Sequence, residues 1–116
     1  MKSYSASNGY VYQYCFREVN RMTHEGGPAG EFIYAISADR RTTFPVRIVV
    51  VQRALQAWAQ ANGRALSSSE EYAVAKMRLF QAFDEGEVPV TDPGAEHLRL
   101  LVDDSRLEDL LRMLNI

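Results

Sequence analysis

The segment 67–86 has the clearest helical signals in the chain, and its amphipathic pattern constrains how the other residues fold. Ser67 and Ser68 each stand three residues before a glutamate, which is the spacing of a capping box at a helix start. Gly86, followed by Pro89, is typical of a helix end. An amphipathic helix of this length must bury its apolar side, so we expect a sheet or another helix against it.

The two faces of this expected helix differ in polarity. At about 100° per residue, one face gathers apolar and aromatic side chains, namely Tyr72, Ala75, Leu79, Ala82 and Phe83, with Ala73 and Phe80 at its flank. The opposite face carries Glu71, Arg78, Gln81 and Glu85, which we expect in water. Lys76 projects within the apolar arc. Its methylenes either cover the rings with the ammonium in water, or the ammonium binds an anion at a pocket edge.

Composition restricts the class of protein. A chain of 116 residues with 47% hydrophobic and 24% charged residues suits one soluble domain with a real core. The formal charge of -2 makes nucleic acid an unfavourable partner. No apolar run reaches about 20 residues, so we expect no membrane span. The N-terminus lacks an apolar segment, and Cys15 is the single cysteine, so we expect a cytoplasmic location.

Three strands are expected in the first half of the chain. Residues 9–19 alternate aromatic side chains with others, a period of two that is typical of a strand, and residues 31–37 and 42–51 show the same alternation. A polar turn at Asp39 and Arg40 joins the latter two. We expect residues 1–8 to be a flexible N-terminus, and the glycine-rich residues 20–30 to form a mobile loop.

The second half is expected to be mainly helical. Residues 52–63 have a helical stripe that ends at Gly63, and residues 105–116 begin with a capping box at Ser105. Residues 97–102 suit a fourth strand, after a turn at Asp92-Pro93-Gly94. A rival helix beginning at Pro45 is rejected because the β-branched run that follows favours extended backbone.

The order of elements is therefore strand-strand-strand-helix-helix-strand-helix within a single domain, 9–116. Strands that precede helices indicate an α+β fold. We expect an antiparallel sheet of three to four strands, with the helices packed mainly on one face.

One-sided packing has a consequence for the other face of the sheet. Val11, Cys15, Ile33 and Val49 fall on that face, which is more apolar than a solvated sheet face. Contiguous exposed apolar surface marks contact sites, so we expect a homodimer or another protein docked on these four residues.

Ligand-binding residues are harder to identify. His24 lies in the glycine-rich segment, where it is either an acid or base or simply solvated. Arg40 and Arg41 form the densest basic cluster, suited to a small anion unless nearby carboxylates pair with them. With Lys76, these residues form an anion site only if the fold brings them together.

No motif for catalysis or metal binding is found. His24, His97 and Cys15 are too scattered for zinc, which takes closely spaced ligand pairs. We therefore expect no catalytic residue, no metal and no cofactor. The hypothesis favoured by the sequence is a non-enzymatic protein-interaction or regulatory module. The alternative is a binder of a small anion or metabolite, or a minor enzyme, with its site near Lys76, Arg40 and His24.

Overall fold

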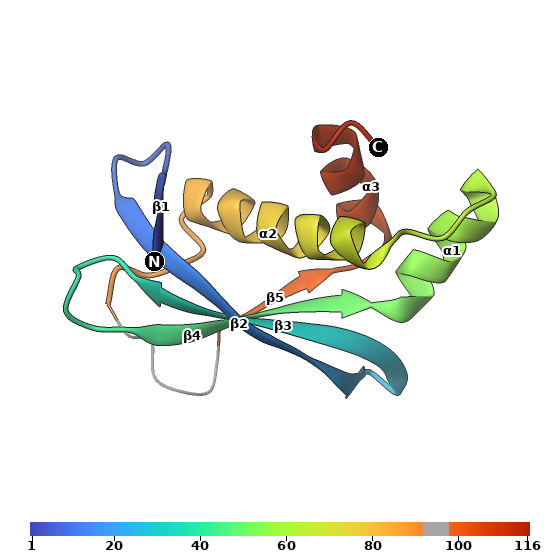
Figure 1. Cartoon of the computed structure of the whole chain (residues 1–116), viewed down its shortest axis with the longest axis horizontal. Coiled ribbons are helices and arrows are strands. Elements are labelled where there is room, and N and C mark those ends of the chain that lie inside the picture. The colour runs from blue at the N-terminus through green and yellow to red at the C-terminus, as the bar shows by residue number, and fades with distance from the viewer. Residues whose placement is uncertain (92–97) are drawn as a thin grey trace.

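The chain forms a curled sheet that wraps around a helix, as a computed structural model of residues 1–91 and 98–116 describes it (Figure 1). In these ranges the elements are β1 (Lys2–Ser5), β2 (Val11–His24), β3 (Gly27–Ser37), β4 (Phe44–Val51), α1 (Gln52–Asn62), α2 (Ser68–Asp84), β5 (Arg99–Val102) and α3 (Asp104–Met113). The molecule measures 45 × 29 × 20 Å. Within the described ranges, no helix combines the length and the apolar character that crossing a membrane requires.

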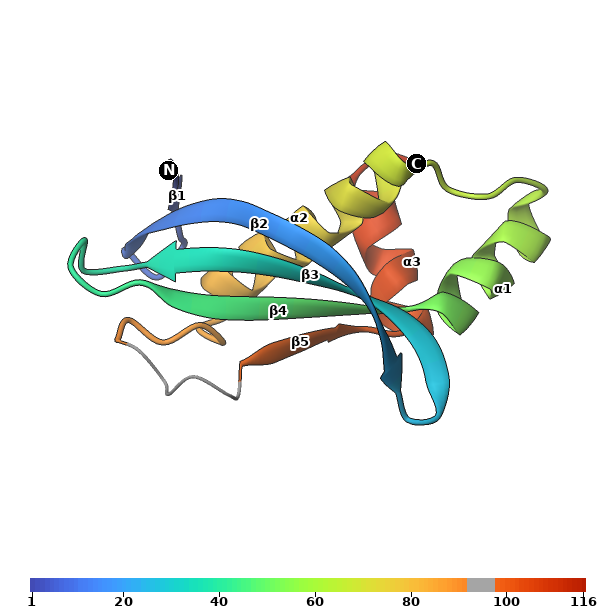
Figure 2. The ribbon, with the colours of Figure 1, turned by 60° about the horizontal axis from the view of Figure 1, so that its bottom comes forward.

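The sheet has the strand order β1-β2-β3-β4-β5 and is mixed (Figure 2). Neighbours from β1 to β4 are antiparallel, whereas β5 runs parallel to β4. The prediction of an antiparallel sheet with three to four strands is therefore wrong, since the described residues contain five strands. Two helices separate β4 from β5 and carry the chain back to the same end of the sheet, which is how parallel neighbours are connected.

The additional strand lies at the N-terminus, which the sequence analysis left outside the sheet as residues 1–8. Residues 2–5 form β1 and pair with residues 11–14 of β2. Gly9 adopts a φ of 92°, and the Ala6 amide donates to the Tyr10 carbonyl over 2.8 Å, which closes the hairpin. Asn-Gly is a strong turn signal between strands. This dipeptide was the available sequence evidence for β1.

The mobile loop predicted for residues 20–30 is also wrong. β2 continues to His24 and β3 begins at Gly27, so the connection is the two-residue turn of Glu25 and Gly26. Their φ angles of 48° and 80° are both positive, as a type I′ turn requires, and this turn matches the twist of paired strands. A β-bulge near Arg17 shifts the register between β2 and β3.

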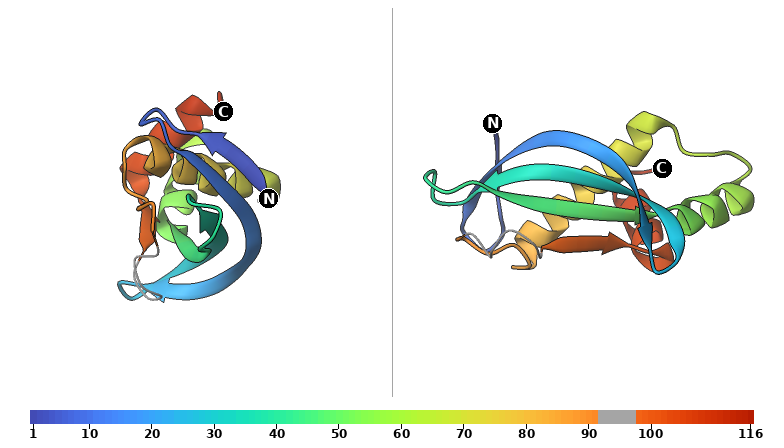
Figure 3. Two further views of the ribbon diagram at one scale, coloured as in Figure 1. Left: turned by 90° about the vertical axis from the view of Figure 1, so that its left-hand side faces the viewer. Right: turned by 90° about the horizontal axis from the view of Figure 1, so that it is seen from below.

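The predicted organising helix is confirmed as α2, which lies against the concave side of the curled sheet (Figure 3). Its Ala75, Leu79, Ala82 and Phe83 are fully buried in the core. The capping box uses Ser67. The Glu70 amide donates to Ser67 Oγ (3.2 Å), and the Ser67 amide donates to Glu70 Oε1 (2.9 Å). Ser68 and Glu71, which have the same spacing, do not form the cap.

Most side chains of the two predicted faces lie as expected, but on the predicted polar face Arg78 is buried and Glu71 is partly buried. The helical period predicts Arg78 in water, but the residue is only 4% exposed. Its guanidinium lies between β5 and the segment after α2, with hydrogen bonds to Leu101 and Glu87. A helical wheel contains no information about elements that follow later in the chain, and these elements cover Arg78.

The other predicted helices are confirmed, with one change of cap. α1 ends at Gly63, whose φ is 72°. α3 begins after Asp103, whose side chain accepts from the Arg106 amide (3.0 Å), so the cap is Asp103 rather than Ser105. The predicted turn Asp92-Pro93-Gly94 and His97 lie outside the described residues.

Candidate functional site

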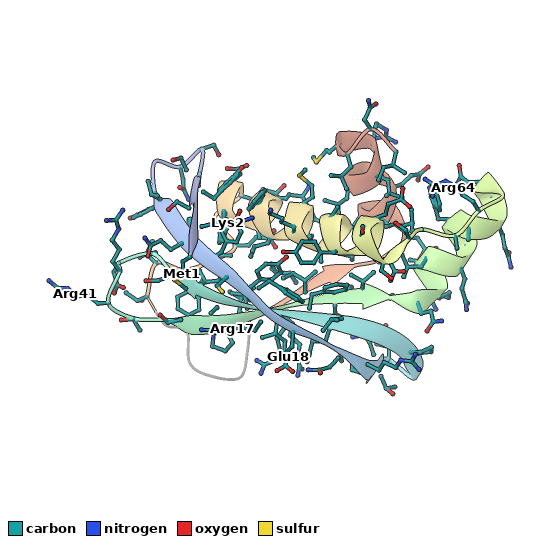
Figure 4. All side chains as sticks on the ribbon, viewed as in Figure 1. Met1, Lys2, Arg17, Glu18, Arg41 and Arg64 are labelled. Carbon is teal, nitrogen blue, oxygen red and sulfur yellow. The ribbon has the colours of Figure 1, made fainter. Side chains whose placement is uncertain are left out.

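The predicted anion-site residues do not come together. His24 ends β2, whereas Arg40 and Arg41 lie in the turn after β3, and the 11 residues of β3 separate the two ends. At about 3.3 Å per residue, this distance is roughly 35 Å. Figure 4 shows Arg41 at one extreme of the molecule, and the β2–β3 hairpin lies toward the other. A single ligand therefore cannot contact both His24 and Arg40.

The backbone amides of the arginine turn find acceptors within the turn. The Arg41 and Thr42 amides each donate to Asp39 Oδ1 over 2.8 Å. These hydrogen bonds, with that of Thr42 the largest contribution, hold the pKa of Asp39 below its ordinary value. An aspartate that caps a turn in this way explains Asp39 without a ligand, whereas the side chains of Arg40 and Arg41 are exposed.

Lys76 of α2 lies over two aromatic rings, one from β2 and one from α2. Its Nζ is 5.7 Å from the centre of the Tyr14 ring and 5.8 Å from that of Phe80. The side chain is partly exposed, and cation–π contacts stabilise a lysine ammonium in this position. This placement favours the interpretation in which the Lys76 side chain covers aromatic rings over the one in which its ammonium binds an anion.

The face of the sheet away from α2 is less apolar than the sequence suggests. The strand register places Val11, Cys15, Ile33 and Val49 together on this face, but their exposure differs. Val11 is 44% exposed, whereas Val49 is only 2% exposed. Glu31 lies on the same face, 3.8 Å from Arg47 and 3.7 Å from Arg99. A partner that docks here would therefore meet charged side chains as well as apolar ones.

A cleft of about 600 Å³ lies on the concave side of the sheet, at the end where β4 leads into α1. Its floor is formed by Gly30, Phe32 and Val50, and its walls by residues of β2, α1 and the start of α2. A Cβ atom added to Gly30 would meet only the Phe32 ring, at 3.6 Å, so the missing side chain leaves space above the strand. The volume is within the range of ligand pockets, about 300–1,000 Å³.

The walls of this cleft are mainly apolar. Leu55 and Ala59 of α1 line one side, and Leu66 lies where the chain enters α2. Glu71 lines the same cleft, and its burial raises the pKa of its carboxyl group above the ordinary value. A carboxylate beside apolar walls is a polar group that fixes the orientation of a ligand.

An unpaired strand edge borders the cleft. β1 pairs with β2 only as far as Tyr14, and in the described residues no strand occupies that side of residues 15–24. Val19, Asn20 and Arg21 of this free edge line the cleft, and Val19 is 52% exposed. The alternating pattern of aromatic side chains predicts a strand that ends at residue 19, so this edge was not predicted from the sequence.

Aromatic rings lie next to the cleft, along the concave side of β2. The Phe16 ring packs edge-on against Tyr72 of α2, with ring centres 5.1 Å apart, and against Tyr34 at 5.5 Å. Phe16 remains 36% exposed because β1 does not reach it. An apolar surface therefore extends from Phe16 to Val19 and into the cleft.

A second hollow of about 430 Å³ lies between Tyr4, α2 and α3. Two of its polar groups bind each other, since Tyr4 Oη donates to Asp84 Oδ2 over 2.6 Å. This bond attaches β1 to the end of α2. The hollow therefore has fewer free polar groups than the cleft.

Comparison with protein-family models, with curated proteins and with solved structures gave no match. Among the described residues, no three His, Cys, Asp or Glu side chains are placed to hold a metal ion.

Proposed function

We propose that the protein is an interaction module that binds an extended segment of a partner protein along residues 15–24 of β2. One side chain of that segment enters the cleft. The observation that carries the proposal is the position of the free strand edge directly beside the cleft. The function class is the one favoured by the sequence, but its site lies at this edge rather than on the convex face.

The strand edge supplies main-chain recognition. A free edge exposes backbone N–H and C=O groups that pair with an added strand. Residues 17–21 are all exposed, so a partner segment can approach them without displacing another element of the described chain. Hydrogen bonds to backbone give affinity that depends little on partner sequence, so specificity must come from side chains.

The cleft supplies side-chain recognition. Alternate side chains of an added strand point to the concave side, where Val19 and Arg21 of β2 lie. A side chain on that side meets the apolar floor formed by Phe32 and Val50. Burial of apolar surface there contributes about 25 cal/mol per Å², which makes the cleft the anchor point of the interface.

Protection against indiscriminate pairing is built into the same edge. The bulge near Arg17, together with the charges of Glu18 and Arg21, is a common device against aggregation of free strands. A partner segment must match this charge pattern, so the edge selects among extended segments.

A peptide library displayed on phage tests the proposal. Selection on the wild-type protein alone should enrich extended segments that use the cleft. The valine of Gly30→Val fills the space above the strand, so enriched peptides should lose at least about tenfold in affinity for this variant, or 1.4 kcal/mol. The matched control is Gly27→Val, on the same strand but outside the cleft lining, and it should leave the affinity unchanged.

Backbone pairing is tested separately with the enriched peptides. Methylation of alternate peptide nitrogens should abolish binding when the methylated amide faces β2, and have little effect one residue further along. Equal effects at both positions, or amide NMR shifts centred on Val11 and Ile33, would reject the β2 edge as the site. The latter result would support the convex face instead.

The oligomeric state and location remain predictions from the sequence. A homodimer is expected on symmetry grounds, and a second copy could occupy either the β2 edge or the face of Val11, Cys15, Ile33 and Val49. Light scattering at micromolar concentration, repeated on Val19→Asp and Val11→Asp, distinguishes the two surfaces. Fractionation of the source cells tests the predicted cytoplasmic location.

A further inference from the structure

We infer that the cleft accepts a basic side chain, with the alkyl stem of a lysine or arginine on its apolar walls and the cationic head at Glu71. The inference rests on the proposed function, because it names the side chain of the partner segment that enters the cleft. It is carried by the position of Glu71, by the chemistry of the walls and by the contrast with Glu70.

Glu70 and Glu71 are adjacent in the chain but have different surroundings. Glu70 accepts from Arg64 Nη1 and Nη2, at 2.8 and 2.9 Å, and from the Ser67 amide. These bonds lower the pKa of Glu70 to about 2, with that of Arg64 the largest contribution. The acceptor capacity of Glu70 is thus used by the cap of α2.

Glu71 lines the cleft and is partly buried there. Within residues 1–91 and 98–116 it forms no salt bridge and no side-chain hydrogen bond that offsets its burial. Burial alone raises its pKa, so the charged form lacks compensation from the protein. A cation that enters the cleft would provide this compensation and regain part of the desolvation cost.

The walls suit a long aliphatic stem. Phe32, Val50 and Leu55 line the cleft together with Glu71 and present apolar surface to it. Lysine and arginine bury their methylenes along such surface while the charged head reaches a polar partner. A purely apolar side chain of the same length would remove water from the Glu71 carboxylate and offer no hydrogen bond, which costs affinity.

Arg21 is the other charged residue that lines the cleft. It is exposed on β2, opposite Gly30 in the register, whereas Glu71 lies on the α2 wall. Its charge repels an incoming cation, so its removal should strengthen cation binding. This residue therefore supplies a second variant whose effect has the opposite sign to that of Glu71.

Small probes with one alkyl chain and different head groups test the inference. Hexylammonium, butylguanidinium, hexanol and hexanoate are titrated into the protein, and the NMR shifts of the cleft residues are followed. We expect probes of this size to bind with dissociation constants of about 1 mM. We expect the two cations to bind about tenfold more tightly than hexanol, and hexanoate to bind most weakly.

Three variants test whether Glu71 and Arg21 determine the preference for cationic probes. Glu71→Gln should reduce the preference for cations over hexanol to about one, and it should fold normally because the amide has nearly the same size and removes a charge that burial disfavours. Arg21→Gln should increase the affinity for hexylammonium. Glu108→Gln removes the same charge from an exposed site on α3 and serves as the control for net charge.

The outcomes separate this inference from the proposed function. Equal binding of hexylammonium and hexanol, a preference that survives Glu71→Gln, or no binding of any probe would overturn the inference. If hexanol alone binds and Gly30→Val abolishes it, the cleft remains a site for an apolar side chain. If the cations are preferred but no displayed peptide uses the β2 edge, the selectivity stands and the proposed function fails.

Discussion

Arg78 and Glu87 form a two-pronged ion pair that joins α2 to the segment after it. Arg78 Nη1 and Nη2 donate to the two carboxylate oxygens of Glu87, over 2.8 and 3.2 Å. The remaining nitrogen, Nε, donates to the Leu101 carbonyl of β5 over 3.1 Å. One guanidinium thus connects α2 with the parallel strand at the edge of the sheet.

Replacement of Arg78 by alanine should destabilise the fold. It leaves Glu87 and the Leu101 carbonyl without their donor, and because Glu87 is 34% exposed we expect a cost of about 2–3 kcal/mol. Urea unfolding measures the change. The control is Arg112→Ala, whose ion pair with Asp109 is exposed, and which should cost less than about 0.5 kcal/mol. Equal losses of stability in the two variants would show that the buried ion pair stabilises the fold no more than the exposed one.

The same pair predicts a dependence of stability on pH. The hydrogen bonds from Arg78 hold the pKa of Glu87 below its ordinary value. A lowered pKa stabilises the folded state above the unfolded value of about 4.3, and this contribution is lost as the pH falls through the folded pKa. Wild type should therefore exceed Glu87→Gln in stability by a constant amount above about pH 5, and by less at lower pH. Glu70 titrates in both proteins, so its effect cancels in the difference. A difference that grows on acidification would contradict the pair's role.

Local patterns predicted much of the fold. The period of the apolar side chains placed α2 against the sheet, and the β-branched run after Pro45 identified β4. The errors have two sources, namely local turns at Gly9 and Gly26 whose hairpins were not predicted, and contacts distant in sequence. β1 is short and has one large apolar side chain, Tyr4, so its pairing depends on the turn at Gly9 and on Asp84 of α2. The direction of β5 depends on the two helices that precede it.

The candidate site was less predictable than the fold. Its cleft combines residues of β2, β3, β4, α1 and α2, and no local spacing relates them. The capping-box motif occurs twice in the sequence, shifted by one residue, as Ser67 with Glu70 and as Ser68 with Glu71. Only the structure shows that Glu70 caps the helix and that Glu71 lines the cleft. His24, Arg40 and Lys76 were chosen for their chemistry, and the fold places them in separate surroundings.

Two glycines of the β2–β3 hairpin should respond to alanine with opposite signs. Gly30 lies within β3 with room for a Cβ atom, so Gly30→Ala should stabilise the protein by about 0.5–1 kcal/mol. Gly26 has a φ of 80° in the turn, so Gly26→Ala should destabilise it by about 1 kcal/mol. Thermal unfolding of the two variants measures both changes. Destabilisation by both would mean that the space above Gly30 is smaller than the cleft requires.

The hydrogen bond from Tyr4 to Asp84 should be visible in the titration of the tyrosines. This bond, together with burial, raises the pKa of Tyr4 to about 12. A raised pKa stabilises the folded state below the unfolded value of about 10, and the contribution is lost as the pH rises through the folded pKa. The ultraviolet difference between wild type and Tyr4→Phe should therefore titrate near 12, and the variant should lose about 1 kcal/mol at neutral pH. Faster amide exchange in β1 of the variant would confirm that this bond holds the strand, whereas a difference that titrates near the ordinary value would exclude it.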